Sequence, residues 1–80
     1  MNQEDAIKLV REELWRALAN YEPMHSAHEG FAVILEEVEE LKVEVFKKQS
    51  SRDLEKMREE SKQIAAMAIR FIVDSTEWDS

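Results

Sequence analysis

The sequence predicts an all-α protein with three helices in a single domain, residues 1–80. Only one Gly and one Pro occur, and 36% of the residues are charged, against roughly 25% in an average domain. Apolar residues recur at intervals of three and four along most of the chain, which is the period of a helix with one buried face. No internal repeat or linker interrupts this pattern.

The first helix is expected from residue 2 or 5 to residue 20. Pro23 disfavours helical backbone at Glu22, so the helix should end before it and leave a break over residues 21–25. The apolar positions of this helix have the spacing of a one-sided amphipathic helix, and they are Ile7, Val10, Leu14, Leu18 and Tyr21.

The second helix is expected to start at Ser26, because Ser26 and Glu29 have the spacing of a capping box. It should continue to about Lys48, where basic residues suit the C-terminal end of the helix dipole. Its apolar residues are expected to share one face, and they are Phe31, Ile34, Leu35, Val38, Leu41 and Val45.

The third helix is expected from about Asp53 to Val73 or Ser75. A short polar connection, residues 49–52, separates it from the second helix. Connections of this length join neighbouring antiparallel helices. The sequence therefore predicts a helical hairpin, with residues 74–80 frayed unless Trp78 docks.

The chain is expected to complete its bundle by homo-oligomerisation, as a homodimer or homotetramer. Residues 64–73 are apolar on almost every side, which is typical of a helix buried on more than one side. A domain of this size has a marginal core, and a chain without Cys gains no support from disulfides or thiolate metal sites.

Charge and hydropathy exclude several classes of function. A net charge of −7 repels phosphate backbones and disfavours nucleic-acid binding through a basic surface. No apolar run approaches 18 residues and the first residues are acidic, so neither a membrane span nor a signal peptide is expected. The absence of Cys fits a cytoplasmic location.

Two acidic clusters flank the predicted turn at matched distances. Counting from Ser50, Glu40 and Glu60 are each ten residues away, and Glu37 and Gln63 are each thirteen away. In an antiparallel hairpin the two pairs become level, at the edges of the facing apolar stripes. Carboxylate and amide oxygens gathered in this way are ligands for a hard cation such as Mg²⁺.

The second helix also stacks like charges. Glu36, Glu40 and Glu44 are spaced by four residues, where each like-charge pair costs roughly 0.2–0.5 kcal/mol. Local violations of this kind are typical of functional sites, and a divalent cation would compensate for them. The alternative is an ordinary solvated acidic face, because E-x-x-E recurs by chance in a chain this rich in Glu.

The two motifs and their surroundings resemble the MazG-like all-α nucleoside triphosphate pyrophosphohydrolases. The family pattern is E-E-x-x-E, a spacer, then E-x-x-D on two adjacent helices. Here the resemblance covers about residues 25–73, and the sequences of residues 28–35 and 63–72 also resemble the family. The residues that carry it are Glu36, Glu37, Glu40, Glu60 and Gln63.

This resemblance implies a helical dimer or tetramer that uses Mg²⁺, with Mn²⁺ as a substitute, to cleave (deoxy)nucleoside triphosphates into monophosphate and pyrophosphate. By position, Glu37, Glu40 and Glu60 would be metal ligands, and Glu36 would either support these ligands from outside or orient water. Gln63 stands where the family usually has Asp. An amide oxygen can bind Mg²⁺ but adds no charge, so a weaker metal site is expected.

The sequence therefore supports two hypotheses about function. One is a Mg²⁺-dependent pyrophosphohydrolase with a nucleoside triphosphate substrate. The other is a non-catalytic helical dimer, a degenerate relative that binds nucleotide or metal, or a protein-interaction module. Trp15 and Tyr21 are interpreted as packing residues, with stacking on a base as the alternative.

Overall fold

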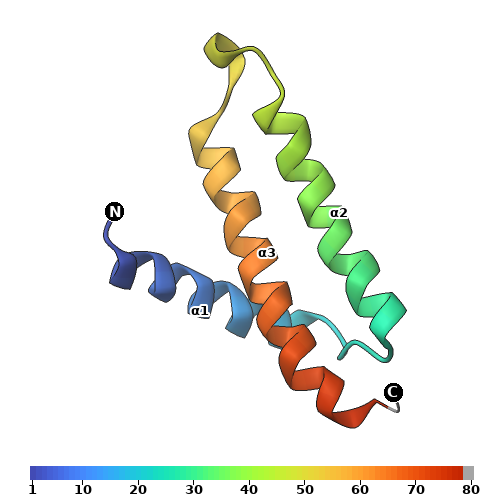
Figure 1. Ribbon diagram of the computed structural model, residues 1–80. Coiled ribbons are helices and arrows are strands. Elements are labelled where there is room, and N and C mark those ends of the chain that lie inside the picture. The colour runs from blue at the N-terminus through green and yellow to red at the C-terminus, as the bar shows by residue number, and fades with distance from the viewer. Residues whose placement is uncertain (79–80) are drawn as a thin grey trace.

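The computed structural model describes residues 1–78 and is all-α over that range. Its helices are α1 (Gln3–Asn20), α2 (Ala27–Val45) and α3 (Leu54–Asp74) (Figure 1). Two short 3₁₀ turns, Gln49–Ser51 and Ser75–Glu77, follow α2 and α3. The predicted fold class and number of helices are confirmed for these residues. None of the three helices is long and apolar enough to cross a membrane.

Helix α3 is the central element of the fold. It lies antiparallel and side by side with α2, while α1 runs across α3 (Figure 1). Ala17 of α1 and Ala66 of α3 are fully buried and belong to one core cluster with Met24 and Met67. The small Ala side chains permit close approach of α1 and α3, so part of the apolar segment 64–73 is buried within one chain, whereas Ile69, Ile72 and Val73 are exposed.

The predicted start of α2 is confirmed. The Ser26 hydroxyl accepts a hydrogen bond from the backbone N–H of Glu29 at 3.1 Å. The Glu29 carboxylate accepts from the backbone N–H of His25 at 3.2 Å, one residue before the expected partner. Both bonds hold the first turn of α2 against the linker.

The predicted end of α2 at Lys48 is wrong, because the helix ends at Val45. The buried Glu44 carboxylate explains this earlier end. It accepts from the backbone N–H of Asp53 at 2.8 Å and from Lys47 Nζ at 2.9 Å, which draws the chain back toward α3. Asp53 itself caps α3 by accepting from the backbone N–H of Lys56 at 3.1 Å.

The linker between α1 and α2 is held by side chains from the C-terminal part of the chain. Arg70 Nη2 donates to the carbonyl of Glu22. The backbone N–H of Met24 donates to Asp74 at 2.9 Å, and its carbonyl accepts from Trp78 Nε1 at 2.9 Å. The alternative to fraying, that Trp78 docks, is therefore confirmed for residues 74–78; residues 79–80 lie outside the described residues.

The apolar face predicted on α2 is only partly buried. Its residues Ile34, Leu41 and Val45 are half-buried, whereas Phe31, Leu35 and Val38 are exposed. The accessible surface of the chain is 6157 Å², against about 5000 Å² for a compact monomer of this mass. The radius of gyration of 13.9 Å also exceeds the about 12 Å of a compact domain of this length.

Substitution of Gly30 by Ala is expected to lower the free energy of unfolding by about 1 kcal/mol or more. A Cβ atom at Gly30 would lie 2.6 Å from Phe71 Cδ2 and 3.2 Å from Met24 Sδ. The Phe71 ring cannot retreat freely, because Trp78 packs edge-on against it at 5.0 Å. This overpacking outweighs the roughly 1 kcal/mol by which Ala is the better helix former.

Urea denaturation measures this loss. The double variant Gly30→Ala, Phe71→Leu is the matched control, because a smaller side chain at position 71 makes room for the new Cβ atom. We expect Phe71→Leu to cost less in the Gly30→Ala variant than in the parent chain. Strictly additive losses would contradict the proposed contact.

Candidate metal centre

Three of the predicted site residues converge between α2 and α3. Glu37 and Glu40 extend from α2 and Glu60 from α3, and one oxygen of each lies within 4.8 Å of the others. The connection between the helices, residues 46–53, is centred on Gln49 and Ser50. Counting outward from Ser50 therefore identifies residues that become level in the hairpin.

The burial of the cluster is uneven. Glu60 is 7% exposed, Glu37 is half-buried and Glu40 is exposed. Atom Oε2 of Glu37 and atom Oε2 of Glu60 are both buried, and no residue among 1–78 donates a hydrogen bond to either. A buried carboxylate oxygen without a donor is costly. A hard divalent cation would satisfy both oxygens, and an all-carboxylate set of ligands fits Mg²⁺ or Mn²⁺.

The carboxylates also change each other's proton affinity. Burial, followed by the adjacent Glu60 carboxyl and the negative charge of Glu40, raises the pKa of Glu37 from 4.5 to about 7. The pKa of Glu40 is raised mainly by its closeness to Glu60. Without a cation, one proton shared within the cluster relieves the repulsion among its negative charges.

Stability without divalent cations is expected to rise as the pH falls from about 7 toward 4.5. In this window the folded chain holds a proton that the unfolded chain has lost, because the pKa of Glu37 is about 7 when folded and 4.5 ordinarily. The carboxyls of Glu44 and Glu59 do not reverse this trend, because the pKa of each is lowered below 4.5 and they protonate at lower pH.

Thermal melting in EDTA at constant ionic strength measures this effect. The variant Glu37→Gln should flatten the trend, because it removes the titrating carboxyl with little change of shape. A melting temperature that falls steadily from pH 7 to pH 5 in the parent chain would contradict the expectation.

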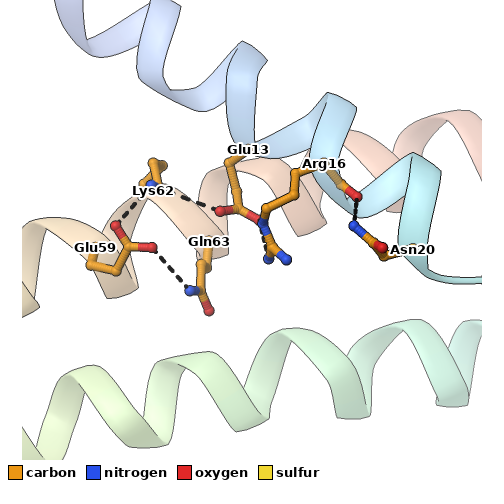
Figure 2. Close-up of polar contacts among 6 residues, drawn as sticks. All are labelled: Glu13, Arg16, Asn20, Glu59, Lys62 and Gln63. Atoms are coloured by element: carbon orange, nitrogen blue, oxygen red, sulfur yellow. Dashed lines mark hydrogen bonds and ion pairs between the residues drawn. The ribbon is translucent and has the colours of Figure 1, made fainter.

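Gln63 lies beside the cluster and is oriented by its own helix. Its amide Nε2 donates to Glu59 Oε1 at 3.3 Å, and Figure 2 shows the side chain extending toward α2. The other Glu59 oxygen lies 2.7 Å from Lys62 Nζ. Since its nitrogen is held by Glu59, Gln63 can direct its amide oxygen to a cation or a water molecule at the site.

A polar network connects Gln63 to α1. Lys62 Nζ lies 3.8 Å from the buried carboxylate of Glu13, which accepts a 2.6 Å hydrogen bond from Arg16 Nη2 (Figure 2). Of the basic residues near the turn, Lys47 and Lys62 are thus paired with carboxylates, and Arg52 donates to the carbonyl of Val45.

A cavity of about 550 Å³ opens next to the cluster, between the three helices and the α1–α2 linker. Glu36, Glu37 and Gln63 line it from α2 and α3. Tyr21 and Arg70 also line it, and Arg70 is a residue that sequence reasoning did not select. The only sequence signal for Arg70 is its position as the one charged residue in the apolar segment 64–73.

The fold and the cluster define a small all-α protein with a carboxylate site across a helical hairpin. Comparisons with the models of known families, with curated proteins and with solved structures found no match to this chain. The function is therefore inferred from the geometry of the carboxylate site.

Proposed function

We propose that Glu37, Glu40 and Glu60 bind Mg²⁺, with Mn²⁺ as a substitute, and that the protein hydrolyses (deoxy)nucleoside triphosphates to monophosphate and pyrophosphate. The observation that carries this proposal is the convergence of three carboxylates from two helices, two of them with a buried oxygen that has no donor among residues 1–78. The resemblance of the acidic motifs to the MazG-like pyrophosphohydrolases supports the same function.

Each residue of the site has a role in this proposal. Glu37, Glu40 and Glu60 hold the cation, and Gln63 contributes a neutral oxygen in place of a fourth carboxylate. Glu36, which lines the cavity beside Glu37, accepts a hydrogen bond from the water that attacks phosphorus. When bound, Mg²⁺ supplies neutralisation of the polyphosphate and a lower pKa for its water. The protein contributes chiefly by positioning these groups.

The cavity provides the substrate side of the site. Its volume of about 550 Å³ lies within the range of small-molecule pockets, roughly 300–1,000 Å³. Carboxylates line it at several points, among them Glu36 and Glu37, and Tyr21, Met24 and Met67 supply aromatic and apolar lining. A ligand with an anionic group that binds a cation and an aromatic group that packs on side chains suits this mixed lining.

The active form is proposed to be a homodimer or homotetramer. The exposed apolar residues of α2, namely Phe31, Leu35 and Val38, would be covered by a second copy of the chain, together with Ile72 and Val73 of α3. The excess of about 1100 Å² of accessible surface per chain over a compact monomer exceeds the roughly 800 Å² that each partner buries in a standard specific interface.

The second candidate is a non-catalytic helical dimer that binds metal or nucleotide, or a protein-interaction module. Two observations favour it: the uncharged Gln63 at a position where a carboxylate would strengthen the site, and the exposed apolar residues of α2. On this interpretation the apolar surface is the functional one, and no nucleotide is turned over.

A screen of the common ribo- and deoxyribonucleoside triphosphates with Mg²⁺ and with Mn²⁺, reading pyrophosphate release, separates the two candidates. Calorimetric titration with Mn²⁺ tests the metal site independently, and sedimentation tests the assembly. Metal binding without any turnover would favour the second candidate. Absence of metal binding would overturn the proposed centre.

A further inference from the structure

Arg70 is a buried cation without a carboxylate partner. The residue is 4% exposed, and no Asp or Glu among residues 1–78 forms an ion pair with it. Its Nη2 atom donates to the carbonyl of Glu22. Its Nε atom is buried and has no acceptor among the same residues.

A guanidinium in this state is unusual. Arg is almost never fully buried unless it is paired, because removal of its charge from water is energetically costly. The single carbonyl of Glu22 occupies one of the five N–H donors of the group. A side chain this buried and this poorly paired, on the wall of a cavity, is suited to receive acceptor atoms from a ligand.

The position of Arg70 relative to the carboxylates indicates which part of the ligand it meets. Arg70 follows Gln63 by seven residues on α3, which places both on one face of the helix about 10.5 Å apart. Both residues line the same cavity. The buried Met67, which lies between them in the sequence, lines it as well. For phosphate groups bound by one cation at the carboxylates, this separation of the two backbone positions favours contact of Arg70 with the nucleoside part of a nucleotide.

We propose that Arg70 is a specificity-determining residue that donates hydrogen bonds to acceptor atoms on the base of a bound nucleotide. The planar fork of guanidinium donors matches adjacent oxygen and nitrogen acceptors on a base edge, such as O6 and N7 of guanine. Tyr21, which lines the same cavity, would lie against the nucleoside. This inference rests on the proposed nucleotide substrate and adds the residue that selects its base.

The variant Arg70→Lys tests this role. Lysine keeps a donor for the Glu22 carbonyl but loses the planar fork. The probes are GMP, AMP, CMP and UMP titrated into the protein in EDTA, and inorganic tripolyphosphate titrated with Mn²⁺ present as a ligand without a base. We expect Arg70→Lys to weaken binding of the preferred monophosphate by roughly 5- to 100-fold and to leave the affinities for Mn²⁺ and for tripolyphosphate unchanged. Arg58→Lys, on an exposed part of α3 outside this cavity, is the matched control.

The outcomes separate this inference from the proposed activity. Base-dependent binding that requires Arg70, in a protein that releases no pyrophosphate, would support the inference and contradict the activity. Equal weakening for monophosphates and tripolyphosphate would overturn the inference, as would a lower melting temperature with unchanged monophosphate affinity. If Arg70→Lys does not fold, the Nε–H resonance of Arg70 in the parent chain decides. It should shift on addition of the preferred monophosphate and not on addition of tripolyphosphate, and a shift with neither would overturn the inference.

Discussion

Glu60→Gln is expected to abolish divalent-cation binding and pyrophosphate release while leaving the fold intact or more stable. Glu60 is the most buried carboxylate of the cluster, and its Oε2 atom has no donor among residues 1–78. Removal of its charge takes away a metal ligand and also relieves the repulsion that raises the pKa values of Glu37 and Glu40. Loss of activity combined with retained stability is typical of a functional site rather than of a structural one.

Loss of a residue that only hydrogen-bonds to a metal ligand lowers metal affinity by roughly 10- to 100-fold. We expect a larger loss of metal affinity in Glu60→Gln, because Glu60 is itself a proposed ligand. Calorimetric titration with Mn²⁺ measures it, and thermal melting in EDTA measures stability. Glu39→Gln is the matched control, because Glu39 lies on α2, is exposed, and is not one of the converging carboxylates. Equal metal affinity in Glu60→Gln and the parent chain would contradict the proposed centre.

Glu44→Ala is expected to lower the melting temperature by roughly 10 °C, the largest stability effect among these predictions. The Glu44 side chain is 1% exposed and joins the two ends of the hairpin connection by accepting from Lys47 and from the backbone N–H of Asp53. The Lys47 ammonium and this backbone N–H hold the pKa of the Glu44 carboxyl below its ordinary value. Alanine removes both bonds and leaves a cavity at the turn.

Thermal melting at pH 7 measures this effect. The variant Glu44→Gln separates the contribution of the hydrogen bond with the Asp53 N–H from that of the ion pair with Lys47. Glutamine retains an acceptor for the Asp53 N–H and loses the ion pair with Lys47, so we expect a smaller decrease. Since the turn sets which residues of α2 and α3 are level, Mn²⁺ affinity should also fall in Glu44→Ala. A melting temperature unchanged by the alanine substitution would show that the turn is held by other contacts.

The helices and the candidate site were predictable because their signals are local in the sequence. The Ser26 cap, Pro23 and the polar connection mark where helices begin and end by short-range hydrogen bonding and steric exclusion. With the turn located, counting outward from Ser50 identified Glu37, Glu40 and Glu60, since two antiparallel helices rise equally per residue.

Periodicity could not predict which polar residues become buried. It assigned Phe31 and Val38 to the core, yet these side chains are exposed, while Glu13, Glu44 and Arg70 are buried. A polar group becomes buried where another segment supplies its partner. Glu13 and Glu44 each have a local partner, Arg16 and Lys47. Each buried group also has one from another segment: Lys62 for Glu13, the Asp53 N–H for Glu44 and the Glu22 carbonyl for Arg70.

The sequence by itself thus determined the fold class, the extent of α1 and α3, the start of α2 and the level of the carboxylates across the hairpin. The tertiary structure alone decided where α2 ends, which side of its apolar surface meets α3, and that Arg70 lies on the cavity wall. The physical reason is that a helical pattern records the preference of each residue for water or for a core. Some of the hydrogen-bond partners that make burial of a charge tolerable exist only after distant segments pack together.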